Sequence, residues 1–320
     1  MARDTSPKGI KKHQRYMRRK LIRQNWDLYL LVAIPVLSLI IFNYIPMFGI
    51  VIAFQDYKVF KGIAGSKWVG LAQFTKLFTS AKFFELLRNT ILINVYKFVY
   101  QFPIPIILAL LLNEVSHEGY KKTVQTITYA PHFISTVVLC GALQLFLSPT
   151  SGLIGRGVNA IRQGIGLVGV NILMDGPAFK WVYVLSGVWQ GTGWASVIYF
   201  AALSAVDVSH LEAAEIDGAN KLQRMWYINL PVLMPTIVIQ LILSCGGILG
   251  VGFEKVYLLQ NDTILAYSEV ISTYVYRAGV NGAQFSFGTA VGLFNNLINA
   301  AMLLLVNAIV RAVDRDMSLL

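Results

Sequence analysis

The stretch EAAEIDGANKLQRMWYINLP, residues 212–231, lies between two strongly apolar runs in a chain where charged residues are otherwise scarce. Its first residues are good helix formers, and Ser209 stands just before them as the expected N-cap. Gly218 is expected to end or bend that helix, because glycine adopts backbone angles that other residues avoid. A second short helix is expected over residues 221–227, and Pro231 suits the first turn of the next apolar run. The stretch therefore predicts a helix–bend–helix at a membrane surface.

The composition of the chain excludes an ordinary soluble domain. Of its 320 residues, 56% are hydrophobic and only 13% are charged, whereas a soluble domain has about 25% charged residues. Both cysteines, Cys140 and Cys245, lie within apolar runs, so neither a disulfide framework nor a metal site is expected. The chain is predicted to be an integral membrane protein.

Six stretches are long and apolar enough to cross a bilayer as helices, which requires about 20 residues. They are residues 29–54, 90–113, 123–148, 181–206, 231–253 and 288–311. The predicted fold class is accordingly all-α, a polytopic membrane protein with six transmembrane helices. Its predicted parts are a basic tail (1–26), a transmembrane domain (27–312) that contains the loop 207–230, and a short tail (313–320).

The orientation is predicted from the basic tail. Residues 1–24 carry nine Lys/Arg against a single acid, Asp4. A nucleic-acid-binding arm is the alternative, but an apolar run follows almost at once, so no nucleic-acid partner is expected. By the positive-inside rule the N-terminus is cytoplasmic. Six spans then place the C-terminus and the loop 207–230 on the same side of the cell membrane.

The spacing of residues in the opening stretch points to a particular family, which its helix and turn propensities alone do not. Glu-Ala-Ala, three residues, Gly, nine residues and Ile-x-Leu-Pro resemble the EAA loop of bacterial ABC importer permeases. Wider stretches, among them NYIPMFGIVIAFQDYKVFKGI and VLSGVWQGTGWASVIYFAALSAVD, resemble the permeases that work with lipoprotein receptors for complex or acidic oligosaccharides, such as aldouronate and pectin fragments. The resemblance extends from about Trp26 to Ala312 and implies the type I ABC importer permease fold.

This resemblance also implies partners and a mechanism. The loop of such permeases is a coupling helix that inserts into a separate ATPase subunit, and here its residues are Glu212, Ala213, Ala214, Asp217 and Gly218. Two ATPase subunits that bind ATP and Mg, a second related permease and an extracellular or lipid-anchored sugar-binding protein are the expected partners. The chain contains no Gly-Lys dipeptide and therefore no phosphate loop of the GxxxxGK[ST] type. No catalytic residue, cofactor or metal is expected in this chain.

Polar side chains within the spans predict the substrate pathway. Placing such a side chain in the membrane costs free energy, so it usually serves a function there. Asn94, Lys97 and Gln101 form one stripe of the second span. Gly191 and Gly193 are expected to loosen or break the fourth span, and the Gly-rich run around Gly247 is expected to unwind the fifth locally. The candidate pathway residues are Asn94, Lys97, Gln101, Trp189, Gln190, Trp194, Gln240, Asn295, Asn296 and Asn299. Amides offer donors and acceptors to sugar hydroxyls. The alternative for each of them is a bond between helices.

Lys97 is the most informative of these residues. A lysine near the bilayer centre costs about 2.5–3.5 kcal/mol on insertion scales. Its partner is a carboxylate on a neighbouring helix, including one of the second permease, or an acidic sugar in passage. The third alternative is that the span boundary lies elsewhere and Lys97 is less deep. The sequence leaves all three open.

Three functions remain at this stage. The predicted function is an ATP-driven, binding-protein-dependent import of oligosaccharides, including acidic or plant-derived ones. An ABC permease for peptides or amino acids is a second reading, and an ion-driven secondary transporter is a third. A membrane-embedded enzyme is disfavoured, because only Lys97 is ionisable and deep in a span.

Overall fold

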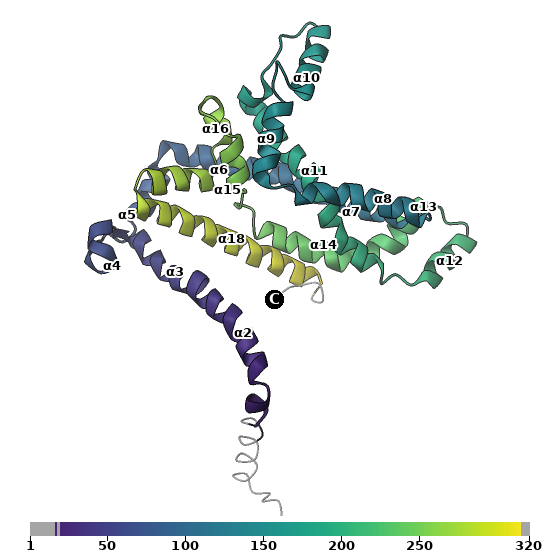
Figure 1. The fold of residues 1–320 in the computed structure, drawn as a ribbon, viewed down its shortest axis with the longest axis horizontal. Helices are drawn as coiled ribbons and strands as arrows, with labels where there is room; N and C mark the ends of the chain where they lie inside the picture. The colour runs from purple at the N-terminus through teal and green to yellow at the C-terminus, as the bar shows by residue number, and fades with distance from the viewer. Residues whose placement is uncertain (1–16, 18–19, 315–320) are drawn as a thin grey trace, which may run out of the picture. The chain divides into compact units, whose positions relative to one another are not determined.

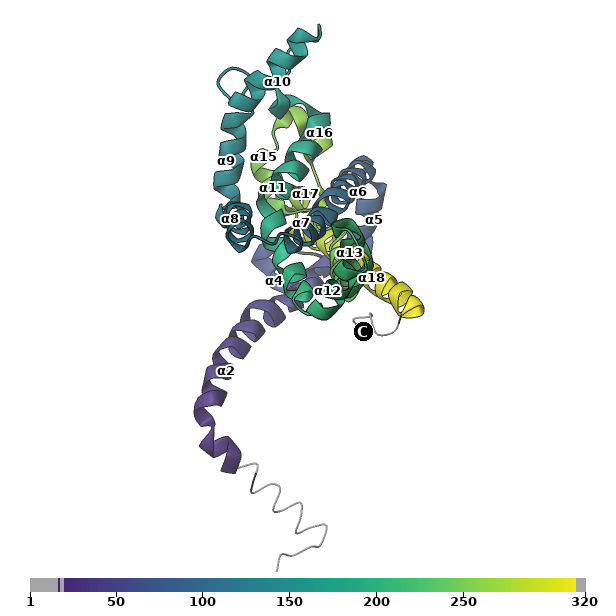
Figure 2. The same cartoon turned by 90° about the vertical axis from the view of Figure 1, so that its right-hand side faces the viewer.

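The computed structural model describes residue 17 and residues 20–314, and the chain divides into two compact units, one up to Val69 and one from Gly70 onward (Figures 1 and 2). Most of the tails predicted over 1–26 and 313–320 falls outside the described residues. Within the described part, four helical runs are long and apolar enough to cross a membrane. The number rises to six if each of two bent helix pairs forms one crossing. The prediction of an all-α polytopic membrane protein is confirmed.

The first unit holds one apolar helical run and a small hairpin. The run comprises α2 (Trp26–Leu39), the π-helix η1 (Ile40–Tyr44), α3 (Ile45–Met47) and the 3-10 helix η2 (Phe48–Phe54). Strand β1 (Gln55–Asp56) then pairs antiparallel with β2 (Lys67–Trp68), and η3 (Val59–Lys61) and α4 (Gly62–Gly65) lie between them. The rings of Phe54 and Trp68 stack with their centroids 5.7 Å apart, which holds the hairpin closed.

The second unit begins with α5 (Ala72–Thr79), α6 (Ala81–Gln101) and α7 (Pro103–Asn113). The Ser80 side chain caps α6 by accepting from the Lys82 backbone N–H. Pro103 occupies the first position of α7, where its missing N–H is not needed. Together α6 and α7 form a run of 33 residues, Ala81–Asn113, that is long enough to cross a membrane.

The stretch predicted as the third span is not one straight helix. Helix α8 (Glu118–Tyr129) and η4 (Ala130–Phe133) are followed by α9 (Thr136–Phe146), and the two parts are bent by 97°. Pro131 cannot donate a helical hydrogen bond, and the Ser135 hydroxyl caps a new helix start by accepting from Val138. Helix α10 (Leu153–Gly164) and η5 (Ile172–Met174) follow, with α10 beyond the end of α9 in Figure 1.

Helix α11 (Gly176–Leu203) is the central helix of the second unit, since α6, α7, α8 and α14 all contact it. The expectation that Gly191 and Gly193 break this helix is wrong, because α11 runs through both residues. Gly193 serves a different purpose: a Cβ atom there would lie 2.1 Å from the Thr128 carbonyl oxygen. Glycine therefore lets α11 and α8 approach closely.

The remaining elements complete the second unit. Helix α12 (Val208–Ile216) follows α11 at an angle of 83°, and α13 (Lys221–Arg224), the π-helix η6 (Met225–Asn229) and α14 (Leu230–Cys245) form the next continuous run. The chain turns at residues 246–249, where the glycine-rich sequence predicts unwinding. Then come α15 (Phe253–Leu259), η7 (Asp262–Ile264), α16 (Leu265–Ser268), α17 (Ile271–Tyr274), the π-helix η8 (Val275–Asn281) and α18 (Phe285–Val313).

Three apolar clusters hold these helices together. One joins α6 and α11 to α15 through residues such as Ile93, Val184 and Val256. A second joins α5 and α6 to α18, and a third joins α7, α11 and α14. Helices α14 and α18 lie side by side in Figure 1 and contact each other. The polar features described next lie among these packed helices.

Candidate functional site: an exposed loop and a polar cavity

The loop between α11 and α14 has the predicted helix–bend–helix form at its first half. Helix α12 has no buried residue, and Glu212 and Ala213 are exposed. Gly218 adopts a φ of 80°, and the Ala219 N–H donates to the Ala214 carbonyl at 2.9 Å. This left-handed ending is typical of glycine after a helix. The bend at Gly218 is therefore confirmed.

Two details of that loop differ from the sequence-based expectation. The N-cap of α12 is Asp207 and not Ser209, since the Ser209 N–H donates to Asp207 Oδ1 at 2.9 Å. This hydrogen bond lowers the pKa of the Asp207 carboxyl. The second helix is also not separate from the next span. It begins at Lys221 after a capping box between Asn220 and Gln223, and it continues without a break to Cys245.

A polar network, here called the loop network, connects the loop to the end of α7. Its members are Glu114, Glu215, Arg224 and Asn229. Arg224 lies 3.0 Å from a carboxylate oxygen of Glu114 and 3.0 Å from one of Glu215. The Asn229 amide donates to the second oxygen of Glu114 at 2.9 Å. The side chains of Glu114 and Arg224 are only 10% and 13% exposed.

A cavity of about 720 Å³ opens between α6, α11 and α14. Its lining residues are Asn94, Val95, Lys97, Phe98, Gln101, Phe102, Pro105, Trp194, Ala195, Ile198, Tyr199, Gln240, Leu243, Ser244, Cys245, Gly247, Ile248 and Gly250. Aromatic rings and amides thus face the same space as one ammonium group. Such a surface suits a sugar, because hydroxyl groups bind amides and the apolar face of a pyranose ring packs on aromatic rings.

Comparison with known proteins identifies the family. Residues 101–319 match the family model described as "Binding-protein-dependent transport system inner membrane component". This chain belongs to that family.

Two curated relatives of the permease come from Bacillus subtilis strain 168. The "Polygalacturonan/rhamnogalacturonan transport system permease protein YteP" is 44% identical over 91% of this chain and 89% of that protein. "Protein LplB" is 38% identical over 92% of each. The shared length shows that the likeness covers both the loop and the cavity helices.

Two solved structures share the fold of the permease. One is described as the "Crystal structure of a bacterial ABC transporter involved in the import of the acidic polysaccharide alginate" and superposes with a TM-score of 0.82, 36% identity, and coverage of 93% of this chain and 99% of that one. The other, a bacterial alginate ABC transporter in complex with an alginate pentasaccharide-bound periplasmic protein, gives a TM-score of 0.81 at 37% identity, with 92% and 97% coverage. The type I importer permease fold is thereby confirmed.

The cavity contains half of the predicted pathway residues. Those that line it are Asn94, Lys97, Gln101, Trp194 and Gln240, and those outside its lining are Trp189, Gln190, Asn295, Asn296 and Asn299. The Gln190 amide donates to the Ile134 carbonyl at 2.8 Å, and Asn299 accepts from the Leu249 N–H at 2.9 Å. These two amides bond to neighbouring segments. They therefore fit the alternative role given for the polar residues of the spans, a bond between helices.

Several residues of the cavity and all residues of the loop network were not predicted from the sequence. Phe98, Phe102 and Tyr199 line the cavity, yet an aromatic residue in a span gives no signal of its own. Glu114 and Arg224 stand at the ends of apolar runs, where solvated charges are common. Only the folded chain brings these two residues together.

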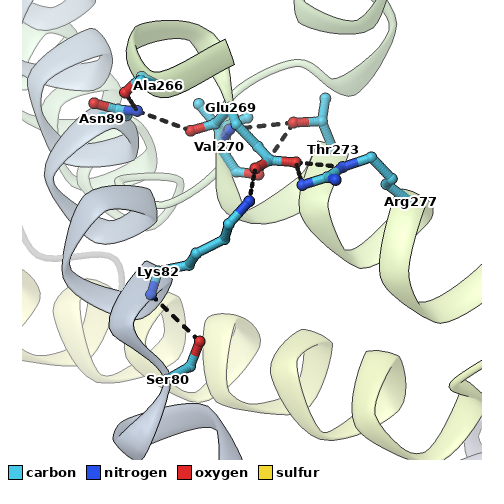
Figure 3. A network of polar contacts seen from close by, with 8 residues as sticks. All are labelled: Ser80, Lys82, Asn89, Ala266, Glu269, Val270, Thr273 and Arg277. Carbon is cyan, nitrogen blue, oxygen red and sulfur yellow. Dashed lines mark hydrogen bonds and ion pairs between the residues drawn. The ribbon is translucent and has the colours of Figure 1, made fainter. Parts of the chain in front are cut away.

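A second network, here called the Glu269 network, joins the α16–α17 connection to α6 (Figure 3). The Glu269 carboxylate is 2% exposed and accepts from Arg277 Nε at 2.7 Å, while Lys82 Nζ lies 4.0 Å away. The Asn89 amide donates to the backbone carbonyls of Ala266 and Glu269, at 2.9 and 3.1 Å. The network therefore fixes the first half of α6 to the segment between α15 and α18.

Among the described residues, no group of three or more His, Cys, Asp or Glu is arranged to hold a metal ion.

Proposed function

We propose that the permease imports oligosaccharides and that separate ATPase subunits drive it. The observation that carries this proposal is the exposed α12–Gly218–α13 loop, in which Glu212, Ala213 and Ala214 precede a glycine bend. A helix with no buried residue of its own is stabilised by docking on another protein. Docking of the loop can affect the cavity through the loop network, because Arg224 connects the loop to α7 and α7 to the cavity wall.

The proposed orientation follows from the basic tail. Its nine Lys/Arg residues support a cytoplasmic N-terminus by the positive-inside rule. The loop and the C-terminus then lie on the same side, and α10 and the Glu269 network lie outside the cell. In this arrangement Glu212, Ala213, Ala214, Asp217 and Gly218 contact the ATPase. The receptor that delivers the sugar approaches from the opposite side.

The proposed complex has several subunits. A second related permease completes the pathway, two ATPase subunits bind ATP and Mg, and an extracellular or lipid-anchored protein captures the sugar. Support for a receptor comes from the solved relative in complex with a sugar-bound periplasmic protein. The part of this chain is to hold the sugar in its cavity and to pass the movement of the loop to α7.

The proposed substrate is an oligosaccharide that carries carboxylates. The polygalacturonan/rhamnogalacturonan permease and the alginate importer are both named for polymers that contain uronic acids. The cavity supports this assignment through its amides and aromatic rings and through the absence of Asp and Glu from its lining. An acidic sugar meets no like charge there.

The direct test reconstitutes the four kinds of subunit in proteoliposomes and measures uptake of labelled oligogalacturonides. Uptake is expected only when ATP, the ATPase and the receptor are all present. Uptake by this chain alone under an ion gradient would show a secondary transporter instead. Stimulation of ATP hydrolysis by peptides and not by sugars would show a peptide permease.

The coupling role of the loop has its own test, in which Glu212→Ala and Gly218→Val are compared with Lys122→Met. Gly218→Val forces a β-branched residue into a left-handed conformation, which costs roughly 1–2 kcal/mol and displaces the loop. Both loop variants are expected to reach the membrane but to lose uptake and receptor-stimulated ATP hydrolysis. Lys122 is a fair control, since its side chain is 76% exposed on α8. Normal uptake by both loop variants would refute the docking role.

A further inference from the structure

Lys97 lies at the middle of the helical run that crosses the membrane beside the cavity. In the proposed orientation the Glu269 network at Asn89 lies outside the cell, and Lys97 is eight residues from Asn89 and sixteen residues from Asn113. At 1.5 Å per residue these separations are about 12 and 24 Å, beyond the reach of a lysine side chain. The ammonium group therefore cannot escape to either membrane surface by extending along the helix.

The Lys97 ammonium has no counter-charge within the described part of the chain. It forms no ion pair or hydrogen bond with any described residue, and none of the residues that line the cavity is Asp or Glu. An unpaired ammonium at this depth is costly. The carboxylates of Glu114 and Glu269 are arranged differently, because each has a basic partner.

A second lysine adds to the positive potential of this region. Lys255 on α15 donates to the Tyr183 carbonyl at 3.0 Å and lies over the Tyr183 ring. Burial, and to a smaller extent the positive charge of Lys97, lower the pKa of Lys255 to about 8. Lys255 therefore remains largely protonated at neutral pH, yet it is fixed by Tyr183 and only Lys97 faces the cavity.

The neighbours of Lys97 are suited to the rest of a sugar ring. Asn94 and Gln101 lie one turn before and one turn after it, and both line the cavity. Their amide nitrogens donate to the carbonyls of Thr90 and Val184, at 2.9 and 3.1 Å. Their side-chain oxygens are left as acceptors for hydroxyl groups. Trp194 and Tyr199 supply aromatic surface on the opposite helix.

We propose that Lys97 is the carboxylate-binding residue of the cavity and that it selects uronate sugars during passage. This inference rests on the proposed function. A charged hydrogen bond from the ammonium to each passing carboxylate supplies the missing counter-charge, and the flanking amides hold the hydroxyl groups of the same or the next sugar. The sugar chain thus crosses the middle of the membrane as a series of transient ion pairs.

The test compares oligogalacturonides with their methyl esters, which keep the shape of the sugar and remove its charge. Uptake is measured in the complete reconstituted transporter at receptor saturation, for the wild type, Lys97→Met, Lys97→Arg and the exposed control Lys122→Met. Because hydrogen bonds to charged groups are worth more than neutral ones, Lys97→Met is expected to lower uptake of the free acid about tenfold or more. Uptake of the ester should be unchanged, and Lys97→Arg should retain acid uptake.

The outcomes separate this inference from the proposed function. Equal loss of both sugars in Lys97→Met, or no loss of either, overturns the role of Lys97 while ATP-dependent sugar uptake still stands. An acid on the partner permease would produce the equal loss. Absence of ATP-dependent uptake of either sugar by the wild type overturns the proposed function itself.

A second measurement uses the unaltered transporter and does not depend on how a variant folds. Lysine side chains are methylated in the assembled complex and analysed by mass spectrometry, with and without each sugar. The free acid is expected to protect Lys97 from methylation and the ester to leave it reactive, while Lys122 reacts equally in both. Equal protection by the two sugars, or none, contradicts the inference.

Discussion

The loop network and the Glu269 network stand at the two ends of the same helical run, Ala81–Asn113, and they are built in opposite ways. In the Glu269 network one deeply buried carboxylate is held by Arg277 and Lys82, whose side chains are 43% and 50% exposed. In the loop network Arg224, whose side chain is 13% exposed, is shared between Glu114, which is 10% exposed, and Glu215, which is 73% exposed. The most shielded group is thus a lone carboxylate in the Glu269 network, whereas in the loop network it is an acid–base pair.

This difference indicates different tasks. The Glu269 network joins two segments that each bury side chains in an apolar cluster, so it fixes the beginning of α6 in place. The loop network ends on α12, which has no buried residue, so one of the two carboxylates bound by Arg224 can move with the loop. One end of the run is anchored, and the other is connected to the loop that we propose docks on the ATPase. On that proposal, movement of the loop is expected to reach the cavity wall between the two networks.

Arg224→Met is expected to have the largest effect. It removes the base from an ion pair that is largely shielded from solvent and leaves the Glu114 carboxylate with only Asn229 as a partner. A charge that loses its partner in such a place destabilises the fold. The thermal unfolding midpoint of the assembled transporter should fall, and uptake per folded transporter should be lost as well. Glu114→Gln combined with Arg224→Met should recover stability, because no buried charge is then unpaired. Uptake should remain low, since the connection to α7 is still missing.

Arg277→Met is expected to have an intermediate effect. Glu269 keeps Lys82 at 4.0 Å, and Arg277 is itself partly solvated, so the cost is about 1–3 kcal/mol. The unfolding midpoint should fall less than in Arg224→Met, and uptake per folded transporter should be retained. Loss of uptake at unchanged stability would show that this end of the run also moves, and the proposed distinction between the two networks would fail.

Glu215→Gln is expected to have the smallest effect on stability. Its carboxylate is largely exposed, and exposed ion pairs contribute about 0–1 kcal/mol. The informative measurement is the ratio of sugar imported to ATP hydrolysed, which should fall because the loop and Arg224 are less firmly connected. An unchanged ratio would place the connection between loop and α7 elsewhere.

The sequence predicted those features that depend on residues close to one another along the chain. The bend at Gly218, the unwinding after Cys245 and the all-α membrane fold follow from local propensity and hydropathy. It did not distinguish Asp207 from Ser209 as the cap, because both can accept a hydrogen bond at a helix start. The bend near Pro131 was also missed, since a single proline within an apolar run permits either a kink or a new helix.

Contacts between distant helices could not be predicted in the same way. A polar stripe such as Asn94, Lys97 and Gln101 shows which residues share a face, but not which helix that face meets. Gln190 and Trp194 are one turn apart on α11, yet only Trp194 lines the cavity. The pairing of Glu114 with Arg224 spans 110 residues of sequence and depends on how the end of α7 packs against α13 and η6.

Photo-crosslinking from the loop tests the central claim most directly. A photoreactive side chain replaces Glu212 in one preparation and Val168, which is 84% exposed just after α10, in another. In the assembled transporter, the side chain at position 212 is expected to crosslink to the ATPase subunit, and the one at position 168 is not. A crosslink to the ATPase from position 168, or none from position 212, would contradict both the docking of the loop and the proposed orientation of the chain.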